Sequence, residues 1–184
     1  MEPREEGYSA WAARWRVPLG LALSVIYVAL AQPTPPLLAA GGAVALVGVA
    51  LRAWAAGYLE KGVSLATAGP YAFTRNPLYF GSTLIGLGFA LAGNSLVMAA
   101  AFAALLVFVY RPVIRREEQF LSQRFGQVYG AYAARVPLLV PRLRRPSSSG
   151  ERFRWDRYRK NREYEAALGY AAGLGLLALK MAVR

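Results

Sequence analysis

The stretch LYFGSTLIGLGFALA, residues 78–92, carries no charged side chain. A helix needs about 20 mostly apolar residues to cross a bilayer, and this run approaches that length once its neighbours are counted. Three further runs share this character, at residues 17–31, 37–51 and 95–110. The Gly-rich run 166–179 is shorter, and we expect it to span rather than lie in the interface. The sequence therefore predicts an all-α, polytopic membrane protein with four core transmembrane helices and a fifth at the C-terminal end.

The basic residues are distributed unevenly around these runs. The chain has 22 Lys and Arg against 10 Asp and Glu, a net charge of +12. The links 32–36 and 93–94 are uncharged, whereas the N-terminal segment, the link 60–77 and the residues after Tyr110 hold nearly all the charge. The positive-inside rule makes these three regions cytoplasmic. The charge thus follows from topology and predicts contact with anionic lipid headgroups, not with nucleic acid.

The predicted organisation follows the same pattern. We expect an interfacial segment over 1–16, a membrane core over 17–142, a basic cytoplasmic linker over 143–165 and a membrane-associated helix over 166–184. Apolar residues at helical spacing predict a cytoplasmic amphipathic helix over 113–135. The sequence PSSSG at 146–150 is typical of a flexible linker. Arg52 interrupts the second apolar run, and we expect it to snorkel towards the interface.

The composition restricts the chemistry. The chain contains no Cys and no His, so disulfides, thiolate or imidazole metal ligands and an imidazole base are excluded. Acid-base chemistry must then fall to Glu, Asp, Tyr or Lys. We expect no metal site.

The polar run from Gly69 to Gly81 leads into the apolar run 78–92 and overlaps its start. It is the first candidate site. Asn76 and Pro77 form a typical helix start, with Asn76 as the cap and Pro77 in the first turn. A helix start also offers N–H groups to an anion or a ligand carboxylate. Tyr71 and Tyr79 are expected either to anchor the interface or to form walls for an aromatic ring or a cation.

The second candidate is the pair Glu117 and Glu118. On a helix, Glu117 has Val113, Ile114, Phe120 and Leu121 as its neighbours, so we expect its carboxylate on the apolar face, where it needs a partner. Glu118 lies at a border position where a solvated ion pair would satisfy it. A charged helix turn with no function is the plainer interpretation of both.

These residues belong to an ordered set of motifs. The set comprises Gly69-x-Tyr71, Arg75-Asn76-Pro77-x-Tyr79-x-Gly81, Glu117-Glu118, Phe125-Gly126-x-x-Tyr129-x-x-Tyr132 and Arg135-Val136-Pro137. Over about residues 37 to 142 it resembles the membrane methyltransferases that include isoprenylcysteine carboxyl methyltransferase and phosphatidylethanolamine N-methyltransferase. The resemblance implies transfer of a methyl group from S-adenosylmethionine to a lipid or lipidated acceptor at the cytoplasmic face. It implies a cofactor pocket formed by Leu65, Ala66, Tyr71, Asn76, Pro77, Tyr79 and Glu117.

Two departures from the family pattern concern the acceptor. Carboxyl methyltransferases of this family usually have His where this chain has Asn76, whereas the phospholipid N-methyltransferases resemble it with Asn-Pro. The Arg that contacts a carboxylate acceptor is expected a turn before the Glu pair, where Arg111 or Arg115 are the nearest substitutes. An ammonium acceptor would instead need a base such as Glu118 or Tyr79.

The sequence also allows two functions other than methyl transfer. A membrane reductase similar to the sterol reductases has a related turn but uses NADPH, and the few basic residues near the turn disfavour a nucleotide phosphate. The other alternative is a small membrane scaffold whose basic tail binds anionic lipid, with the turn and the Glu pair purely structural.

Overall fold

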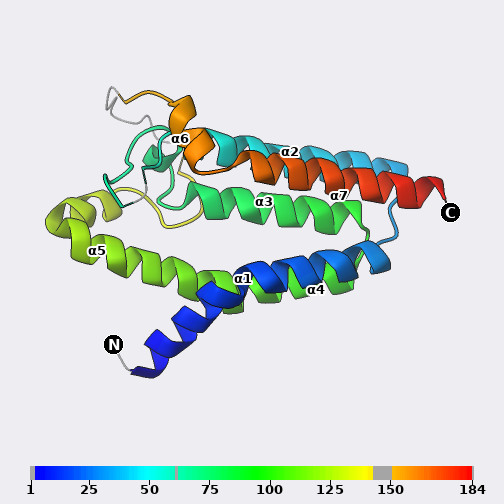
Figure 1. Cartoon of the computed structure of the whole chain (residues 1–184), viewed down its shortest axis with the longest axis horizontal. Helices are drawn as coiled ribbons and strands as arrows, with labels where there is room; N and C mark the ends of the chain where they lie inside the picture. Colours follow the sequence, from blue (N-terminus) through cyan, green and yellow to red (C-terminus); the bar gives the residue numbers. More distant parts are fainter. Residues whose placement is uncertain (1–2, 61, 143–150, 184) are drawn as a thin grey trace. The chain divides into compact units, whose positions relative to one another are not determined.

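The computed structural model describes residues 3–60, 62–142 and 151–183, and these residues form helices and connecting loops without a β-strand (Figure 1). The elements are α1 (Pro3–Leu30), α2 (Pro35–Ala56), the 3-10 turn η1 (Gly69–Ala72), α3 (Pro77–Ala92), α4 (Leu96–Leu105), the π-helical turn η2 (Leu106–Tyr110), α5 (Arg111–Ala133), α6 (Trp155–Lys160) and α7 (Tyr164–Ala182). The predicted all-α class is confirmed. The predicted linker at 146–150 lies outside the described residues.

Three helical stretches are long and apolar enough to cross a membrane, namely Pro35–Ala56, Leu96–Ala133 and Tyr164–Ala182. Two shorter apolar helices, Val17–Leu30 and Pro77–Ala92, coincide with the other predicted runs. The C-terminal run is therefore longer as a helix than its apolar residues suggested, because the helix begins at Tyr164. At the other end, the predicted interfacial segment and the first apolar run form one helix that contains Pro18.

The described residues divide into two compact units, and the first draws on the ranges Met1–Ala45, Gly86–Gln119 and Ala171–Arg184. Ala31, Ala92 and Leu177 form its buried core. The hydroxyl of Tyr27 donates a hydrogen bond of 2.5 Å to the Phe89 carbonyl. Lys180 donates to the carbonyls of Val28 and Ala29 at 2.7 and 2.6 Å, so it satisfies acceptors at the end of α1 that the helix itself cannot bond.

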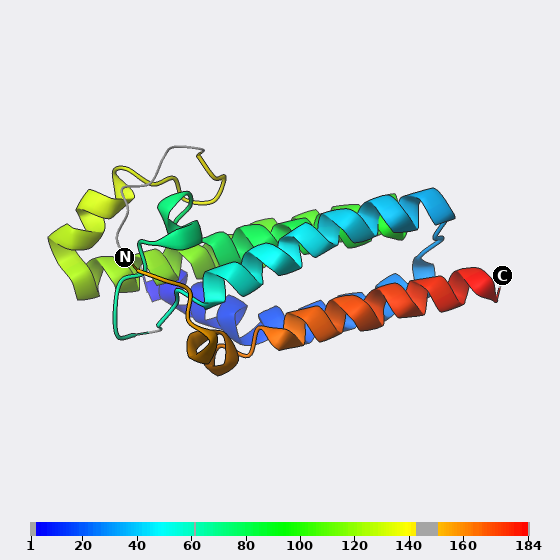
Figure 2. The ribbon, with the colours of Figure 1, turned by 90° about the horizontal axis from the view of Figure 1, so that it is seen from above.

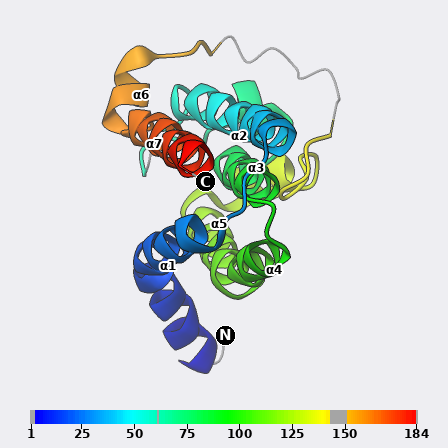
Figure 3. The same cartoon turned by 90° about the vertical axis from the view of Figure 1, so that its right-hand side faces the viewer.

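The second unit consists of Leu46–Ile85 and Phe120–Tyr170 and contains the polar turn. Here α2 and α3 lie side by side (Figure 3), and Gly48 faces Gly81 with so little space that a Cβ on Gly48 would be 2.5 Å from the Gly81 carbonyl oxygen. Small residues at such a crossing allow membrane helices to pack backbone against backbone. The close packing brings the end of α2 beside the start of α3.

The predicted amphipathic helix over 113–135 corresponds to α5, which follows η2 without a break and ends at Ala133. Its backbone leaves the helical conformation at Gly126, where φ is 49° and ψ is −124°. The last turns of α5, yellow-green in Figure 2, change direction at this point. A glycine is needed here because other residues rarely adopt a positive φ.

The glycine contact between α2 and α3 makes a testable prediction. Gly48→Ala should reduce the unfolding free energy by about 1–3 kcal/mol, because the added methyl group overpacks a backbone contact. A lower melting temperature in detergent would report this loss. Gly175→Ala is the matched control, since nothing lies within 4 Å of a Cβ there. Equal melting temperatures for the two variants would show that the helices do not pack this closely.

Candidate functional site

The polar turn between α2 and α3 is built by glycine and proline at its two ends. Gly69 has φ of 57°, which lets the chain enter η1, and Pro77 begins α3. The Asn76 carbonyl accepts the N–H of Phe80 at 3.0 Å, so Asn76 occupies the position before the helix, as the sequence predicted. Thr74, between the two ends, is fully buried.

Segment 136–142 runs beside this turn and bonds to its backbone. The N–H of Arg75 donates to the Pro137 carbonyl at 2.9 Å, and the N–H of Arg142 donates to the Phe73 carbonyl at 3.0 Å. The hydroxyl of Thr74 donates to the Leu139 carbonyl at 2.9 Å. The irregular backbone of the turn therefore has hydrogen-bond partners within the protein, as buried backbone groups require.

The Asn76 side chain takes part in the same pairing. Its amide Nδ2 donates to the Leu138 carbonyl at 3.0 Å. This bond uses the donor end of the amide and leaves its oxygen as the acceptor that the predicted capping role requires. Asn76 therefore holds two segments together besides beginning the helix.

The last turns of α5 hold the turn from another side. The Tyr132 hydroxyl donates to the Tyr71 carbonyl at 2.7 Å, and Arg75 donates to the Tyr129 hydroxyl at 3.4 Å. Both tyrosines follow the Gly126 bend and are buried, with ring centroids 6.2 Å apart. From the sequence, these tyrosines had a place in a motif but no assigned role; in the structure they bond to the turn at η1 and Arg75.

The second unit brings together the predicted cofactor residues of the link and the helix start. Ala66 and Tyr71 are buried in one cluster with Ala55, and Pro77 is buried at the start of α3. Leu65 and Tyr79 are half-buried on either side of the turn in sequence. The remaining predicted site residues, Arg111, Arg115, Glu117 and Glu118, belong to the first unit, on α5.

The Glu pair differs from the expectation. Glu117 is exposed and Glu118 is half-buried, although helical spacing placed Glu117 on the apolar face. Val113 and Ile114 are indeed buried, but Phe120 is 52% exposed, so the apolar stripe is not covered along its whole length. Arg111 and Arg115 are both exposed.

Arg52 does not snorkel freely, which corrects the sequence interpretation. Its Nε and NH2 atoms donate to the two carboxylate oxygens of Glu163 at 2.9 Å each, and its NH1 donates to the Ser82 hydroxyl. Glu163 is only 7% exposed. The fork of a guanidinium suits a carboxylate in this way. The sequence offered no specific signal for this pair, because Glu163 is one of two acidic residues shortly before the run 166–179.

Within the part of the chain that is described, no three acidic side chains gather in a way that could hold a metal ion.

A family model described as phospholipid methyltransferase matches residues 39–128. The chain is 35% identical to the cobalt-zinc-cadmium resistance protein CzcN of Cupriavidus metallidurans, over 74% of this chain and 56% of that protein. It is 32% identical to the nickel-cobalt-cadmium resistance protein NccN of Alcaligenes xylosoxydans xylosoxydans, over 70% of this chain and 63% of that protein.

The chain is also 35% identical to protein-S-isoprenylcysteine O-methyltransferase B of Arabidopsis thaliana, over 45% of this chain and 42% of that protein. It spans less than two thirds of the length of the two resistance proteins. No solved structure matches the chain.

The pair between Arg52 and Glu163 can be tested by an isosteric substitution. Glu163→Gln should cost about 3–5 kcal/mol of unfolding free energy, because it leaves the partly buried Arg52 without its counterion. Thermal unfolding in detergent measures the loss.

Glu165→Gln is the control, because Glu165 pairs with Arg162 at the surface, where such pairs contribute at most about 1 kcal/mol. A Glu163→Gln protein as stable as this control would contradict the assigned role of the pair.

Proposed function

Because the chain belongs, through residues 39–128, to the phospholipid methyltransferase family of membrane proteins, we propose that it transfers a methyl group from S-adenosylmethionine to a lipid or lipidated acceptor. The relative from Arabidopsis thaliana acts, by its name, on protein isoprenylcysteine.

The observation that carries the proposal is the polar turn before α3, which lies inside the matched range and is fixed on two sides. The N–H groups in the first turn of a helix have no acceptor within that helix. A ligand carboxylate at the start of α3 would be favoured by these donors and by the helix dipole. Buried Tyr71 and half-buried Tyr79 supply aromatic surface to a cation.

These groups fit the parts of S-adenosylmethionine, which supplies an electrophilic methyl group on a sulfonium cation together with an amino group and a carboxylate. In this assignment the cofactor residues are Leu65, Ala66, Tyr71, Asn76, Pro77, Tyr79 and Glu117. Positioning and exclusion of water are the chief requirements of such a transfer. The buried Ala66 and Tyr71 provide the dry side of the proposed pocket.

For the acceptor we propose a chemical class, either an ammonium group or a carboxylate. Glu118, half-buried on α5, is the proposed base if the acceptor is an ammonium group, with Tyr79 as the other candidate. Arg111 and Arg115 are exposed on the same helix, Arg111 about two turns and Arg115 less than one turn before the pair, and they are the proposed contacts for a carboxylate acceptor. Either acceptor would reach the site through the bilayer.

We propose that the site faces the cytoplasm, because most basic residues lie on the links at that side. Arg152, Arg159 and Lys160 are exposed, and Trp155 between them is 68% exposed. Basic residues beside a membrane helix attract anionic headgroups by about 1 kcal/mol each. The segment 152–160 is therefore the proposed contact for anionic lipid headgroups.

Cofactor titration tests the proposal. The purified protein should bind S-adenosylmethionine, and removing one charge of the Glu pair by Glu117→Gln or Glu118→Gln should weaken binding or slow transfer by about tenfold or more, since a hydrogen bond to a charged group contributes about 1.5–3 kcal/mol. Isothermal titration gives the affinity, and mass spectrometry of membrane lipids identifies the methylated acceptor.

Arg116→Gln is the control on the same helix, because Arg116 is exposed and has no assigned role. Binding of NADPH in place of S-adenosylmethionine would favour the reductase. A protein that binds neither cofactor, and in which the Glu variants change nothing, would favour the scaffold.

A further inference from the structure

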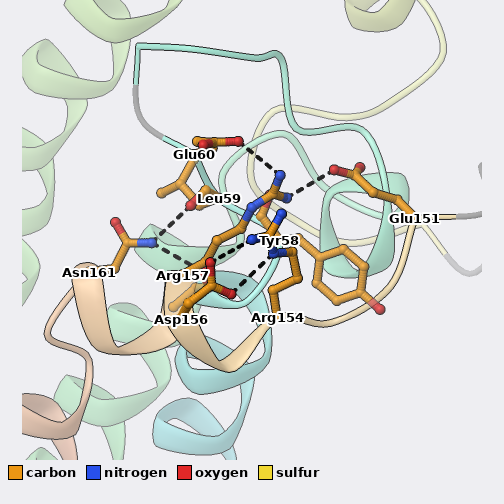
Figure 4. Close-up of polar contacts among 9 residues, drawn as sticks. Tyr58, Leu59, Glu60, Glu151, Arg154, Asp156, Arg157 and Asn161 are labelled. Atoms are coloured by element: carbon orange, nitrogen blue, oxygen red, sulfur yellow. Dashed lines mark hydrogen bonds and ion pairs between the residues drawn. The ribbon is translucent and has the colours of Figure 1, made fainter.

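Residues 151–163 lie outside the family match, yet they fold onto the end of α2 (Figure 4). The N–H of Arg154 donates to the Gly57 carbonyl at 3.0 Å. The Phe153 ring covers Gly57 so closely that a Cβ there would be 2.2 Å from the ring. The same ring stands edge-on to Tyr58, with centroids 6.3 Å apart. This segment is thus packed against the chain and is not merely a basic linker.

Arg157 is the centre of the polar contacts in this segment. Its guanidinium bonds to Glu60 at 2.9 Å, to Glu151 at 3.0 Å and to the Tyr58 carbonyl at 3.3 Å (Figure 4). Its side chain is largely buried. Two of the three partners belong to the link that follows α2, so one side chain fixes both the backbone and a carboxylate of that link.

Asn161 completes the end of α2. Its Nδ2 donates to the carbonyls of Ala56 at 3.1 Å and Leu59 at 2.9 Å. The last carbonyls of a helix receive no N–H donor from within the helix. A side-chain donor at this place therefore acts as a C-terminal cap that comes from a distant part of the sequence. The capped residues lead directly into the link 57–68.

The link 57–68 carries residues of the proposed cofactor pocket. Farther along it, Arg124 donates to the Gly62 carbonyl at 2.6 Å, and Ala66 is buried against Tyr71. Gly62 itself is exposed with φ of 74°. The link contains little regular structure between Gly57 and η1, so its order must come from these contacts.

We propose that residues 151–163 form a clasp that orders the link 57–68, with Arg157 and Asn161 as positioning residues for the cofactor pocket. For its effect on the cofactor this inference rests on the proposed function. The apparent affinity for a ligand is proportional to the fraction of the protein that has the competent conformation. The clasp keeps that fraction high, because it fixes the link before the ligand arrives.

Hydrogen–deuterium exchange of the full chain in detergent tests the clasp without any ligand. Arg157→Gln should increase exchange in the link 57–68 and leave the first unit unchanged. Arg154→Gln is the matched control, because the exposed Arg154 side chain hydrogen-bonds to Asp156, an exposed neighbour whose carboxyl pKa it holds below the ordinary value by that hydrogen bond. Asn161→Ala is a second variant in case Arg157→Gln does not fold. Exchange that stays at the wild-type level in both clasp variants would overturn the proposal.

The cofactor gives a second measurement. The Kd for S-adenosylmethionine should rise about tenfold in Arg157→Gln and Asn161→Ala, while kcat at saturating cofactor stays at the wild-type value, because only the ordering of the link is lost. An unchanged Kd in variants whose link exchanges faster would refute the positioning role. A wild-type protein that binds no S-adenosylmethionine would refute the proposed function, whereas the exchange comparison would still decide whether the clasp exists.

Discussion

A buried peptide group must find its hydrogen-bond partner within the protein, because burial removes it from water. The turn between α2 and α3 meets this constraint with an irregular backbone that also carries Arg75 and Asn76. Its solution is a second irregular segment, 136–142, whose carbonyls accept from the backbone and side chains of the turn. The bend at Gly126 then allows Tyr132 to reach the Tyr71 carbonyl. The candidate site is thus a consequence of satisfying the backbone.

The same constraint explains the role of the C-terminal part of the second unit. Asn161 donates to the carbonyls of Ala56, at the end of α2, and of Leu59, and Arg157 donates to the Tyr58 carbonyl; both donors come from about a hundred residues later in the chain. Arg52, one turn earlier on α2, pairs with Glu163 from the same segment. A cation within an apolar helix is stable only with such a partner or with water. One segment therefore neutralises the charge and caps the helix.

The sequence predicted the elements that depend on local composition, and it missed the contacts that depend on distant residues. The apolar runs and the helix start at Pro77 follow from residue type and spacing, and the structure confirms them. The pair of Arg52 with Glu163 joins residues 111 positions apart, for which periodicity carries no signal. The exposure of Glu117 beside a half-buried Glu118 was missed for a related reason. Helical spacing gives the direction of a side chain but not what covers it.

Asn76 shows how a contact in the structure changes the meaning of a motif residue. In the sequence, its departure from the His of the carboxyl methyltransferases bore on the choice of acceptor. In the structure, its amide N–H₂ donates to the Leu138 carbonyl and joins the turn to segment 136–142. That carbonyl requires a donor, and an imidazole N–H is also a donor. The residue at position 76 therefore reports how the turn is held. Under the proposed function, the choice of acceptor falls instead to the groups proposed to contact it, the half-buried Glu118 or the exposed Arg111 and Arg115, which differ in charge.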